Sequence, residues 1–225
     1  MIERPGIEEL ESETPAIEDN VPGVFKATQK RSIRIRDAYI QAGFEALNAT
    51  RFRDLRITDL AEACQCSVGS FYTRFQDKEA YFRALTAATI ADCNRQIDAR
   101  VSADLLREMG ADRALEELVD LMADIFSGRF RGVLREALLR ILEPDDPWAP
   151  MRASARRIIA NYHAALSDVF PQFAQEEAEI RLSFCFQIIV GVLQNDLVND
   201  YHVFSTRDRS VRAALKENIA CYMAS

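Results

Sequence analysis

The chain has 225 residues, of which 48% are hydrophobic, and a formal net charge of −7 at pH 7. This length and apolar content suffice to bury a full core in one or two domains. The five cysteines show no Cys-x-x-Cys spacing and the chain has only two histidines. A disulfide framework and a tetrahedral zinc site are therefore excluded, and no cofactor is expected.

The first 25 residues contain one basic and seven acidic residues, with three prolines among them. Such segments bury too little apolar surface to fold, so we predict a disordered acidic lead over residues 1–25. The start of the chain lacks the charged-then-apolar pattern of an export signal, and no apolar run approaches the length of a membrane span. We therefore expect a cytoplasmic protein with no membrane partner.

Residues 26–56 reverse this balance, with eight basic residues against three acidic ones. A basic module in an otherwise acidic chain is typical of nucleic-acid binding. A solvated helix face would explain the same charges. The apolar spacing in this stretch predicts a helix over residues 28–49.

Residues 56–82 predict two short helices joined by a tight turn and followed by a longer helix. Leu60, Ala61 and Ala63 give the first short helix a small apolar face, and the pattern breaks at residues 65–66. Ser67 then caps the second short helix. This succession is the pattern of a helix-turn-helix that reads DNA.

The second short helix has two distinct faces. Phe71 and Phe75 are four residues apart and face inward. The side chains predicted to face outward are small or polar, as in a recognition helix; they are Gly69, Ser70, Thr73 and Arg74, with Tyr72 at the flank.

Residues 67–79 resemble the signature of the TetR/AcrR family of bacterial regulators. They read Ser-Val-Gly-Ser-Phe-Tyr-Thr-Arg-Phe-Gln-Asp-Lys-Glu. The family pattern is Ser, any residue, Gly, Thr or Ser, an apolar residue, Tyr, two variable residues, Phe, two spacers and Lys-Glu. By motif the resemblance covers residues 31–85, and the rest of the chain is similar only in its helical layout.

Three positions depart from the family pattern. Arg51 stands where the family usually has a glycine that ends the first helix, and Arg56 replaces a common capping Thr or Ser. Gln65-Cys66 occupies the turn where Gly-Val is common. Because Gln adopts a left-handed conformation only at some cost, we predict a strained or rearranged turn with the motif retained.

The resemblance and the exposed positions of the second short helix together assign the DNA contacts. The residues assigned to base edges are Val68, Gly69, Ser70 and Thr73, with Thr58 reaching the groove from the preceding helix. Those assigned to phosphates are Arg56, Tyr72, Arg74 and Lys78. Ser67 completes the predicted DNA-binding set.

Beyond Lys78 the apolar periodicity, with breaks at Gly110, Gly128, Pro144 and Pro171, predicts helices only. The predicted ranges are 78–100, 112–127, 130–142, 149–168, 175–199 and 208–223. The fold class is all-α with about nine helices. We predict a three-helix helix-turn-helix domain at 26–77 and a helical effector-binding and dimerisation domain at 78–225, linked by the fourth helix.

The predicted helix at 175–199 is apolar nearly all round, so it must be covered on more than one side. Packing within one core would account for this. The family resemblance implies that the last two helices pair with a second copy, and that the homodimer binds a palindromic operator in double-stranded DNA. The predicted interface residues are Phe186, Val190, Leu193, Leu197, Leu215, Ile219 and Tyr222.

The resemblance also implies a pocket for a small-molecule effector. The candidates combine aromatic surface with a few polar tips; they are Met122, Phe126, Phe130, Leu138, Ile141, Trp148, Tyr162, His163 and Phe184. An ordinary core role is the alternative for each. The mix favours a largely apolar or aromatic effector that releases the protein from DNA, so the predicted function is a ligand-responsive repressor.

Two other modes of control stay open: cysteine oxidation through Cys64 and Cys66 beside the turn, or a protein partner. An enzyme is disfavoured. The sequence shows no clustered metal ligands, no Gly-rich phosphate loop and no paired nucleophile and base.

Overall fold

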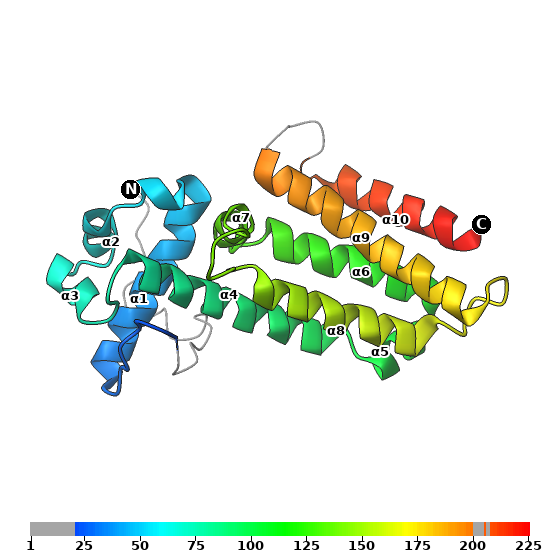
Figure 1. Cartoon of the computed structure of the whole chain (residues 1–225), viewed down its shortest axis with the longest axis horizontal. Helices are drawn as coiled ribbons and strands as arrows, with labels where there is room; N and C mark the ends of the chain where they lie inside the picture. The colour runs from blue at the N-terminus through cyan, green and yellow to red at the C-terminus, as the bar shows by residue number, and fades with distance from the viewer. Residues whose placement is uncertain (1–20, 200–204, 206–207) are drawn as a thin grey trace. The chain divides into compact units, whose positions relative to one another are not determined.

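The computed structural model describes residues 21–199, 205 and 208–225, and the chain within these ranges is helical with no regular strand. The predicted all-α fold is confirmed, and residues 1–20 of the predicted lead lie outside the described residues. The helices are α1 (Lys30–Ala49), α2 (Ile57–Ala63), α3 (Val68–Tyr72), α4 (Lys78–Arg100), α5 (Ala103–Met109), α6 (Ala111–Ser127), α7 (Arg131–Leu139), α8 (Ala149–Leu166), α9 (Gln175–Asn199) and α10 (Arg209–Ala224), with a 3-10 turn, η2 (Phe52–Asp54), after α1 (Figure 1).

These helices form two compact units that divide within α4. In the described part of the chain, unit 1 comprises the residues up to 92 together with 129–147, and unit 2 comprises 93–128 and the residues from 148 onward. Unit 1 therefore contains α7 in addition to the helix-turn-helix. The functional boundary between residues 77 and 78 stays a prediction, because compactness does not assign function.

Side-chain caps account for two of the helix starts. Ser67 Oγ accepts a hydrogen bond from the Ser70 amide at 3.2 Å, as predicted for α3. Ser102 Oγ accepts one from the Leu105 amide in the same way and begins α5, a helix absent from the predicted set. α5 ends at Gly110, whose φ is 77°. A serine cap and a terminal glycine were the signals for this helix.

Helix α7 ends three residues before the predicted limit at 142, because the chain leaves the helical conformation at Arg140. The guanidinium of Arg140 lies 5.2 Å from the ring centroid of Phe52 and 4.6 Å from that of Phe82. It also pairs with the Glu79 carboxylate at 2.6 Å. These contacts hold Arg140 against α4 and the 3-10 turn, and end the helix there.

Four aromatic side chains form the centre of unit 1. Tyr39 of α1, Phe71 of α3, Phe75 and Tyr81 of α4 are fully buried. The Tyr39 ring meets Phe71 edge-on at 5.6 Å between centroids, and Tyr81 meets Phe75 at 4.9 Å. The Tyr81 hydroxyl donates to the Tyr39 carbonyl at 2.5 Å, and the Tyr39 hydroxyl donates to the Ser67 carbonyl at 3.3 Å. α1 and α4 therefore hold α3 in place.

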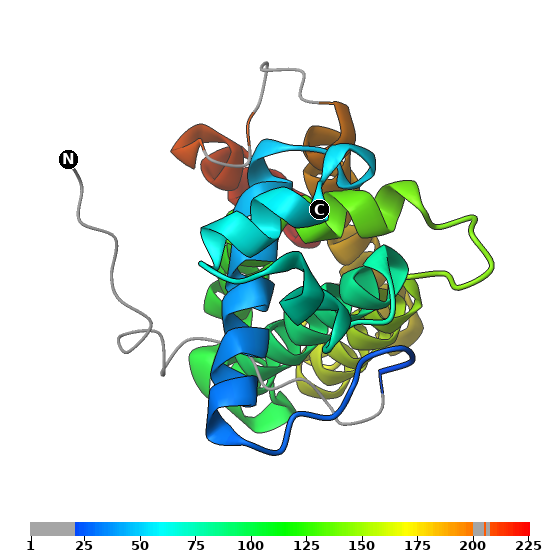
Figure 2. The ribbon, with the colours of Figure 1, turned by 90° about the vertical axis from the view of Figure 1, so that its left-hand side faces the viewer.

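Residues 21–25 are paired with the segment after α3, although they were predicted to belong to the disordered lead. The Phe25 amide donates to the Arg74 carbonyl at 2.8 Å. Val24 and Phe75 form an antiparallel bridge. Figure 2 shows this segment in dark blue at the start of α1. The predicted limit of the lead at residue 25 is corrected, because backbone pairing fixes residues 21–25.

Helices α1 and α7 cap each other within unit 1. Asn48 Oδ1 accepts a hydrogen bond from the Gly132 amide at 2.7 Å, in the first turn of α7. Arg135 donates to the carbonyls of Leu47 and Thr50 at 2.9 and 2.7 Å, at the end of α1. Each helix thereby satisfies terminal backbone groups of the other. This mutual capping replaces the glycine cap that the family pattern has at the end of the first helix.

Arg51 occupies the position of that glycine and forms an ion pair. Its Nε lies 2.5 Å from the carboxylate of Glu136 in α7, and Glu136 is buried. A cationic partner offsets part of the cost of burying a carboxylate. The departure from the family pattern therefore contributes to the docking of α7 on α1.

Helix α9 is long and apolar enough to cross a membrane by length and composition, whereas no apolar run of that length was expected. Its buried residues are Ala178, Leu182, Cys185, Phe186, Ile189, Leu193, Asp196 and Leu197. A helix that packs in a protein core has the same composition, so this apolarity is weak evidence for a membrane span.

We expect Gly132→Ala to destabilise the protein. A Cβ atom at Gly132 would lie 2.2 Å from the carbonyl carbon of Leu47, so α1 and α7 would have to separate. The expected loss is about 1–3 kcal/mol in the free energy of unfolding, measured by urea denaturation.

Gly69→Ala is the matched control, because a Cβ atom there would meet only Ser67 Oγ, at 3.8 Å. This variant should be as stable as the wild type, or more stable by up to about 1 kcal/mol. Equal stability of the two variants would contradict the close packing of α7 on α1.

Candidate nucleic-acid interface

The turn between α2 and α3 contains a strained backbone conformation. Gln65 has a φ of 52°, in the left-handed region that residues with a Cβ atom avoid. The Cys66 amide donates to the Ala61 carbonyl at 2.8 Å and closes the turn. The predicted strain is confirmed. On α2, Ala63 is exposed, contrary to prediction, and Cys64 is buried in its place.

Helix α3 and Thr73, the residue after it, present four exposed positions to solvent. Val68 and Tyr72 are 39% and 49% exposed despite their apolar surface. Gly69 and Thr73 are exposed beside them. We call these four residues the outer face of α3. Phe71, on the opposite side of the helix, is fully buried and fixes α3 to the core. The outer face is therefore available to contact another molecule.

Two residues predicted to contact DNA are turned toward the protein. Arg74 is 8% exposed, and its Nη1 donates to the Ser70 carbonyl at 2.7 Å and to Ser70 Oγ at 3.0 Å. Ser70 itself is half-buried. The prediction that Arg74 holds a phosphate is corrected, because a guanidinium buried against the preceding helix does not reach a DNA backbone.

The other polar residues of the predicted set lie at the edges of the motif. Arg56 is exposed and pairs with Asp59 at 2.9 Å, an ion pair that contributes little and exchanges readily. Thr58 Oγ1 donates to the same carboxylate at 3.2 Å. The Lys78 ammonium lies 4.7 Å from the ring centroid of Phe52, and burial lowers the pKa of Lys78 below its usual value.

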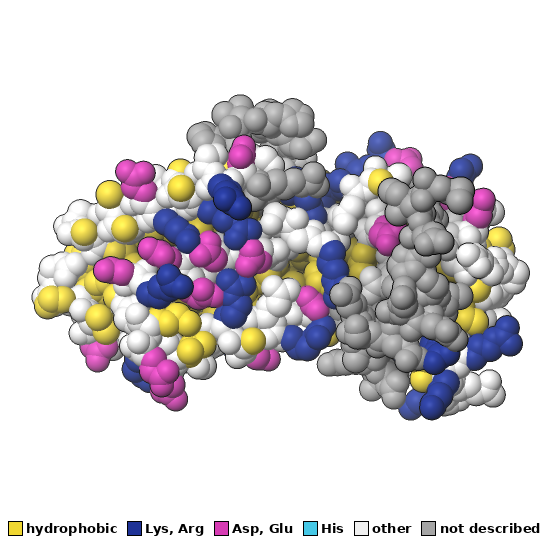
Figure 3. All heavy atoms as spheres, turned by 180° about the vertical axis from the view of Figure 1, so that it is seen from behind, with side chains coloured by type: hydrophobic (Ala, Val, Ile, Leu, Met, Phe, Trp, Pro, Cys, Tyr) yellow, Lys and Arg dark blue, Asp and Glu magenta, His cyan; other side chains and the backbone are white. Residues whose placement is uncertain are grey.

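The two units differ in their charged surfaces. Figure 3 shows groups of Lys and Arg side chains on unit 1 together with some Asp and Glu, and both signs of charge interleave over unit 2. Ion pairs within unit 2 join three helices: Arg100 of α4 binds Asp124 of α6 at 2.9 Å, and Arg212 of α10 binds the same carboxylate at 2.7 Å. Ion pairs occur in both units, so the attraction of an anionic partner to unit 1 rests on the excess of basic residues in residues 26–56.

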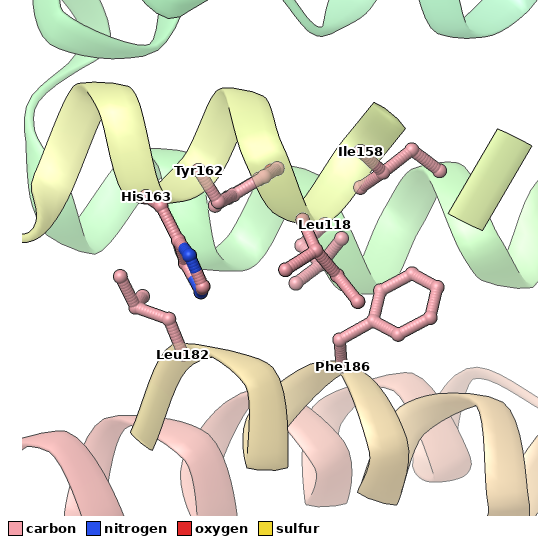
Figure 4. A pocket seen from close by; sticks show the side chains of 7 residues that line it. Leu118, Ile158, Tyr162, His163, Leu182 and Phe186 are labelled. Atoms are coloured by element: carbon pink, nitrogen blue, oxygen red, sulfur yellow. The ribbon is translucent and has the colours of Figure 1, made fainter. Parts of the chain in front are cut away.

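A narrow hollow in unit 2 contains two of the predicted pocket residues. Tyr162 and His163 of α8 face Leu182 and Phe186 of α9 across it (Figure 4). The remaining lining residues are Leu118, Ile158 and Ile159. The hollow does not admit a water molecule. His163 has a ring nitrogen 3.0 Å from Ser183 Oγ, as expected of a hydrogen-bonded structural histidine.

Four further predicted pocket residues belong to unit 2 but do not line the hollow. Phe126 and Trp148 are buried with their ring centroids 6.3 Å apart, and Met122 is buried in α6. Phe184 is 48% exposed, with its ring 5.4 Å from that of Tyr222. The aromatic content of these segments did not reveal which side chains share a cavity.

The last three predicted pocket residues belong to unit 1. Phe130 is buried with its ring 4.8 Å from that of Phe44 in α1. Leu138 and Ile141 are half-buried in α7 and just beyond it. Phe130 therefore supports the docking of α7 on α1, a role that sequence spacing did not predict.

Most of the predicted dimer-interface residues are buried inside a single chain. The buried ones are Phe186, Leu193, Leu197, Leu215 and Ile219, while Val190 and Tyr222 are half-buried. This residue assignment is corrected, because side chains packed within unit 2 are not available to a second copy. Dimerisation itself stays a prediction.

The apolar side chains that α9 exposes are different ones, and sequence reasoning missed three of them. They are Ile180, Phe184, Val192 and Val198, which we call the α9 stripe. Gly191 lies within the stripe, and a Cβ atom there would meet nothing within 4 Å. The sequence indicated that α9 is apolar nearly all round, but it did not show which direction faced the core.

Cys64, beside the turn of the helix-turn-helix, is poorly suited to redox chemistry. Burial, and next the neighbouring Cys66, raise the pKa of Cys64 to about 12. Burial also raises the pKa of Cys185 to about 11. Because the thiolate is the form that reacts with oxidants, these shifts disfavour sensing by Cys64. Cys221 is the exposed cysteine of the five, all of which are free.

Unit 1 contains a helix-turn-helix, and the described residues of unit 2 are arranged in helices. No protein-family model and no curated protein matches the sequence. Solved structures do match. A protein described as a TetR-family transcriptional regulator from Mesorhizobium loti is 16% identical, with a TM-score of 0.65 over 87% of this chain and 96% of its own.

Two further structures give the same result. A TetR-family regulator from a Rhodococcus species is 17% identical, with a TM-score of 0.56 over 84% of this chain and 98% of its own. GusR from Salmonella enterica is 15% identical, with a TM-score of 0.56 over 89% of this chain and 100% of its own. The chain therefore has the TetR-type fold. Identities this low establish the fold and not the function.

Gly69→Ala should weaken operator binding while leaving stability intact. Nothing within the chain crowds a Cβ atom at this position, so the fold does not require glycine there. A partner that approaches the outer face closely would meet the added methyl group, at a cost of about 1–3 kcal/mol in binding free energy. Fluorescence anisotropy with labelled duplex measures the loss, and unchanged affinity would show that no partner comes close to Gly69.

The rate of alkylation should differ between Cys64 and Cys221. At pH 8 a thiol with a pKa of about 12 is almost entirely protonated, so iodoacetamide should modify Cys221 quickly and Cys64 only after unfolding. Mass spectrometry of the native and urea-treated protein measures both rates. Native modification of Cys64 as fast as that of Cys221 would restore the case for redox control.

Proposed function

We propose that the protein is a transcription regulator that binds double-stranded DNA through the outer face of α3. The observation that carries this proposal is the contrast within α3, whose inner side is fully buried while Val68, Gly69, Tyr72 and Thr73 are exposed. A short helix presented in this way fits the major groove. The TetR-type fold supports the same function by analogy.

The proposed contacts are of two kinds, those to base edges and those to the phosphate backbone. Val68, Gly69 and Thr73 approach base edges, whereas Arg56 and Lys78 at the edges of the motif hold phosphates. Each phosphate contact releases counterions, so binding weakens steeply as salt rises. The solved structures with this fold are described as transcriptional regulators, which supports a role without catalysis.

The active form is a homodimer joined through the α9 stripe. Exposed apolar side chains along one helix mark an interaction surface. Gly191 leaves open space within the stripe, which allows two α9 helices to approach closely. A twofold dimer presents two copies of the outer face of α3, so the operator is palindromic.

A small effector controls the dimer from the hollow between α6, α8 and α9. Leu118 and Leu182 give this hollow an apolar lining, and His163 adds a polar group. A largely apolar or aromatic molecule fits this chemistry. Because the hollow does not admit water, binding has to separate the helices. An effector that prefers the separated arrangement lowers operator affinity, which makes the cytoplasmic protein a repressor released by its ligand.

Control by cysteine oxidation has less support, because burial raises the pKa of Cys64 to about 12. Control by a protein partner instead of a ligand is not favoured by any observation on the described residues.

Selection of bound duplexes from random DNA tests the proposed function. The wild type should enrich an inverted repeat whose half-site centres lie about 10 base pairs apart, or a multiple of that spacing. Thr73→Asp is the control, because a carboxylate on the outer face repels DNA and should abolish enrichment. Failure of the wild type to enrich any sequence would contradict DNA recognition by this protein.

Phe184→Glu should dissociate the dimer. A carboxylate in the α9 stripe would lose its hydration on pairing, and the dissociation constant should rise at least about thirtyfold. Analytical ultracentrifugation should show a dimer for the wild type and a folded monomer for the variant. Leu142→Glu is the matched control, since Leu142 is 96% exposed but lies outside the stripe. A monomeric wild type at micromolar concentration would refute the dimer.

A further inference from the structure

Thr73 is exposed, yet its hydroxyl both donates and accepts a hydrogen bond within the protein. Thr73 Oγ1 donates to the Ser70 carbonyl at 2.8 Å. The same oxygen accepts a hydrogen bond from Arg74 Nη1 at 2.9 Å. A threonine hydroxyl has one proton to donate, and here that proton is committed to the backbone of α3.

Arg74 holds this arrangement in place. Besides Thr73, its Nη1 lies within hydrogen-bond distance of the Ser70 carbonyl and Ser70 Oγ, at 2.7 and 3.0 Å. The guanidinium is buried at the C-terminal end of α3, where a positive charge is favourable. Rotating the Thr73 side chain would break both of its own bonds and leave a buried cation with fewer acceptors. The orientation of the Thr73 hydroxyl against the helix is therefore fixed.

These hydrogen bonds determine which group of Thr73 is available to a partner. Because Oγ1 is turned onto the α3 backbone, the γ-methyl group is the part of this exposed side chain that remains for contact. Val68 adds two further methyl groups to the same outer face, and Gly69 adds no side chain. Between these positions the surface is apolar, although a sequence reading of Thr73 suggests a hydrogen-bonding group.

We propose that Thr73 reads a thymine through its C5-methyl group, and that Arg74 is the positioning residue that imposes this mode of reading. Among the four bases, only thymine carries a methyl group in the major groove, and a threonine methyl is a suitable apolar contact for it. This inference rests on the proposed function, and it adds the chemistry by which one operator base is chosen.

The test uses the operator that the wild type selects, with each thymine of a half-site replaced in turn by deoxyuridine. This replacement removes only the methyl group. At one position the wild type should lose about three- to tenfold in affinity, the effect of one lost methyl contact. Thr73→Val keeps the methyl and lacks the hydroxyl, so it should bind within twofold of the wild type and show the same loss.

Thr73→Ser is the converse variant, because it keeps the hydroxyl and lacks the methyl. It should bind the thymine operator about three- to tenfold more weakly than the wild type and no longer distinguish thymine from deoxyuridine. If Thr73→Val loses affinity while Thr73→Ser retains it, the hydroxyl reads the base and the inference is wrong.

Arg74→Met tests the positioning role, since Met fills similar volume without hydrogen-bond donors. Its affinity for random DNA and its helical circular dichroism should match the wild type, whereas the preference for thymine over deoxyuridine should fall below twofold. An unchanged preference would refute the role of Arg74. If no duplex is enriched at all, the proposed function fails; if an operator is found that tolerates every deoxyuridine, only this inference fails.

Discussion

Unit 1 depends on two tyrosine hydroxyls that link buried aromatic rings to the backbone. Tyr81 donates to the Tyr39 carbonyl and Tyr39 donates to the Ser67 carbonyl, so one chain of hydrogen bonds runs from α4 through α1 to the cap of α3. Burial raises the pKa of both phenols, which keeps them neutral donors. Gly43 makes the contact possible, because a Cβ atom there would lie 2.2 Å from the Tyr81 hydroxyl oxygen. The outer face of α3 is exposed on a fixed base for this reason.

The parts of this arrangement that follow from local patterns were predictable from the sequence. The spacing of Phe71 and Phe75 identified the inner side of α3, and Ser67 identified its start. The departure from the family pattern at Gln65 predicted a strained turn, and the turn is strained. This was predictable because the strain depends only on the backbone conformation of that residue. The same reasoning placed the start of α4 at Lys78. Each of these features is decided by residues close together in the chain.

The features that were not predicted depend on contacts between distant residues or on the end of a helix. Arg74 lies beyond the last residue of α3, so a helical wheel does not describe its direction, and its guanidinium turns back onto Ser70. Leu193 and Phe184 both lie on an apolar helix, and only packing shows that one is buried and the other exposed. The capping of α1 by Arg135 joins helices far apart in sequence.

The central claim is that the outer face of α3 contacts base edges in the major groove. Backbone amide shifts of the isotope-labelled protein, followed by NMR during titration with the selected operator, test this claim most directly. The account predicts that the largest operator-specific shifts occur at Val68, Gly69, Tyr72 and Thr73, and that they are absent with random duplex of equal length. Specific shifts that leave α3 unchanged and appear elsewhere would contradict it.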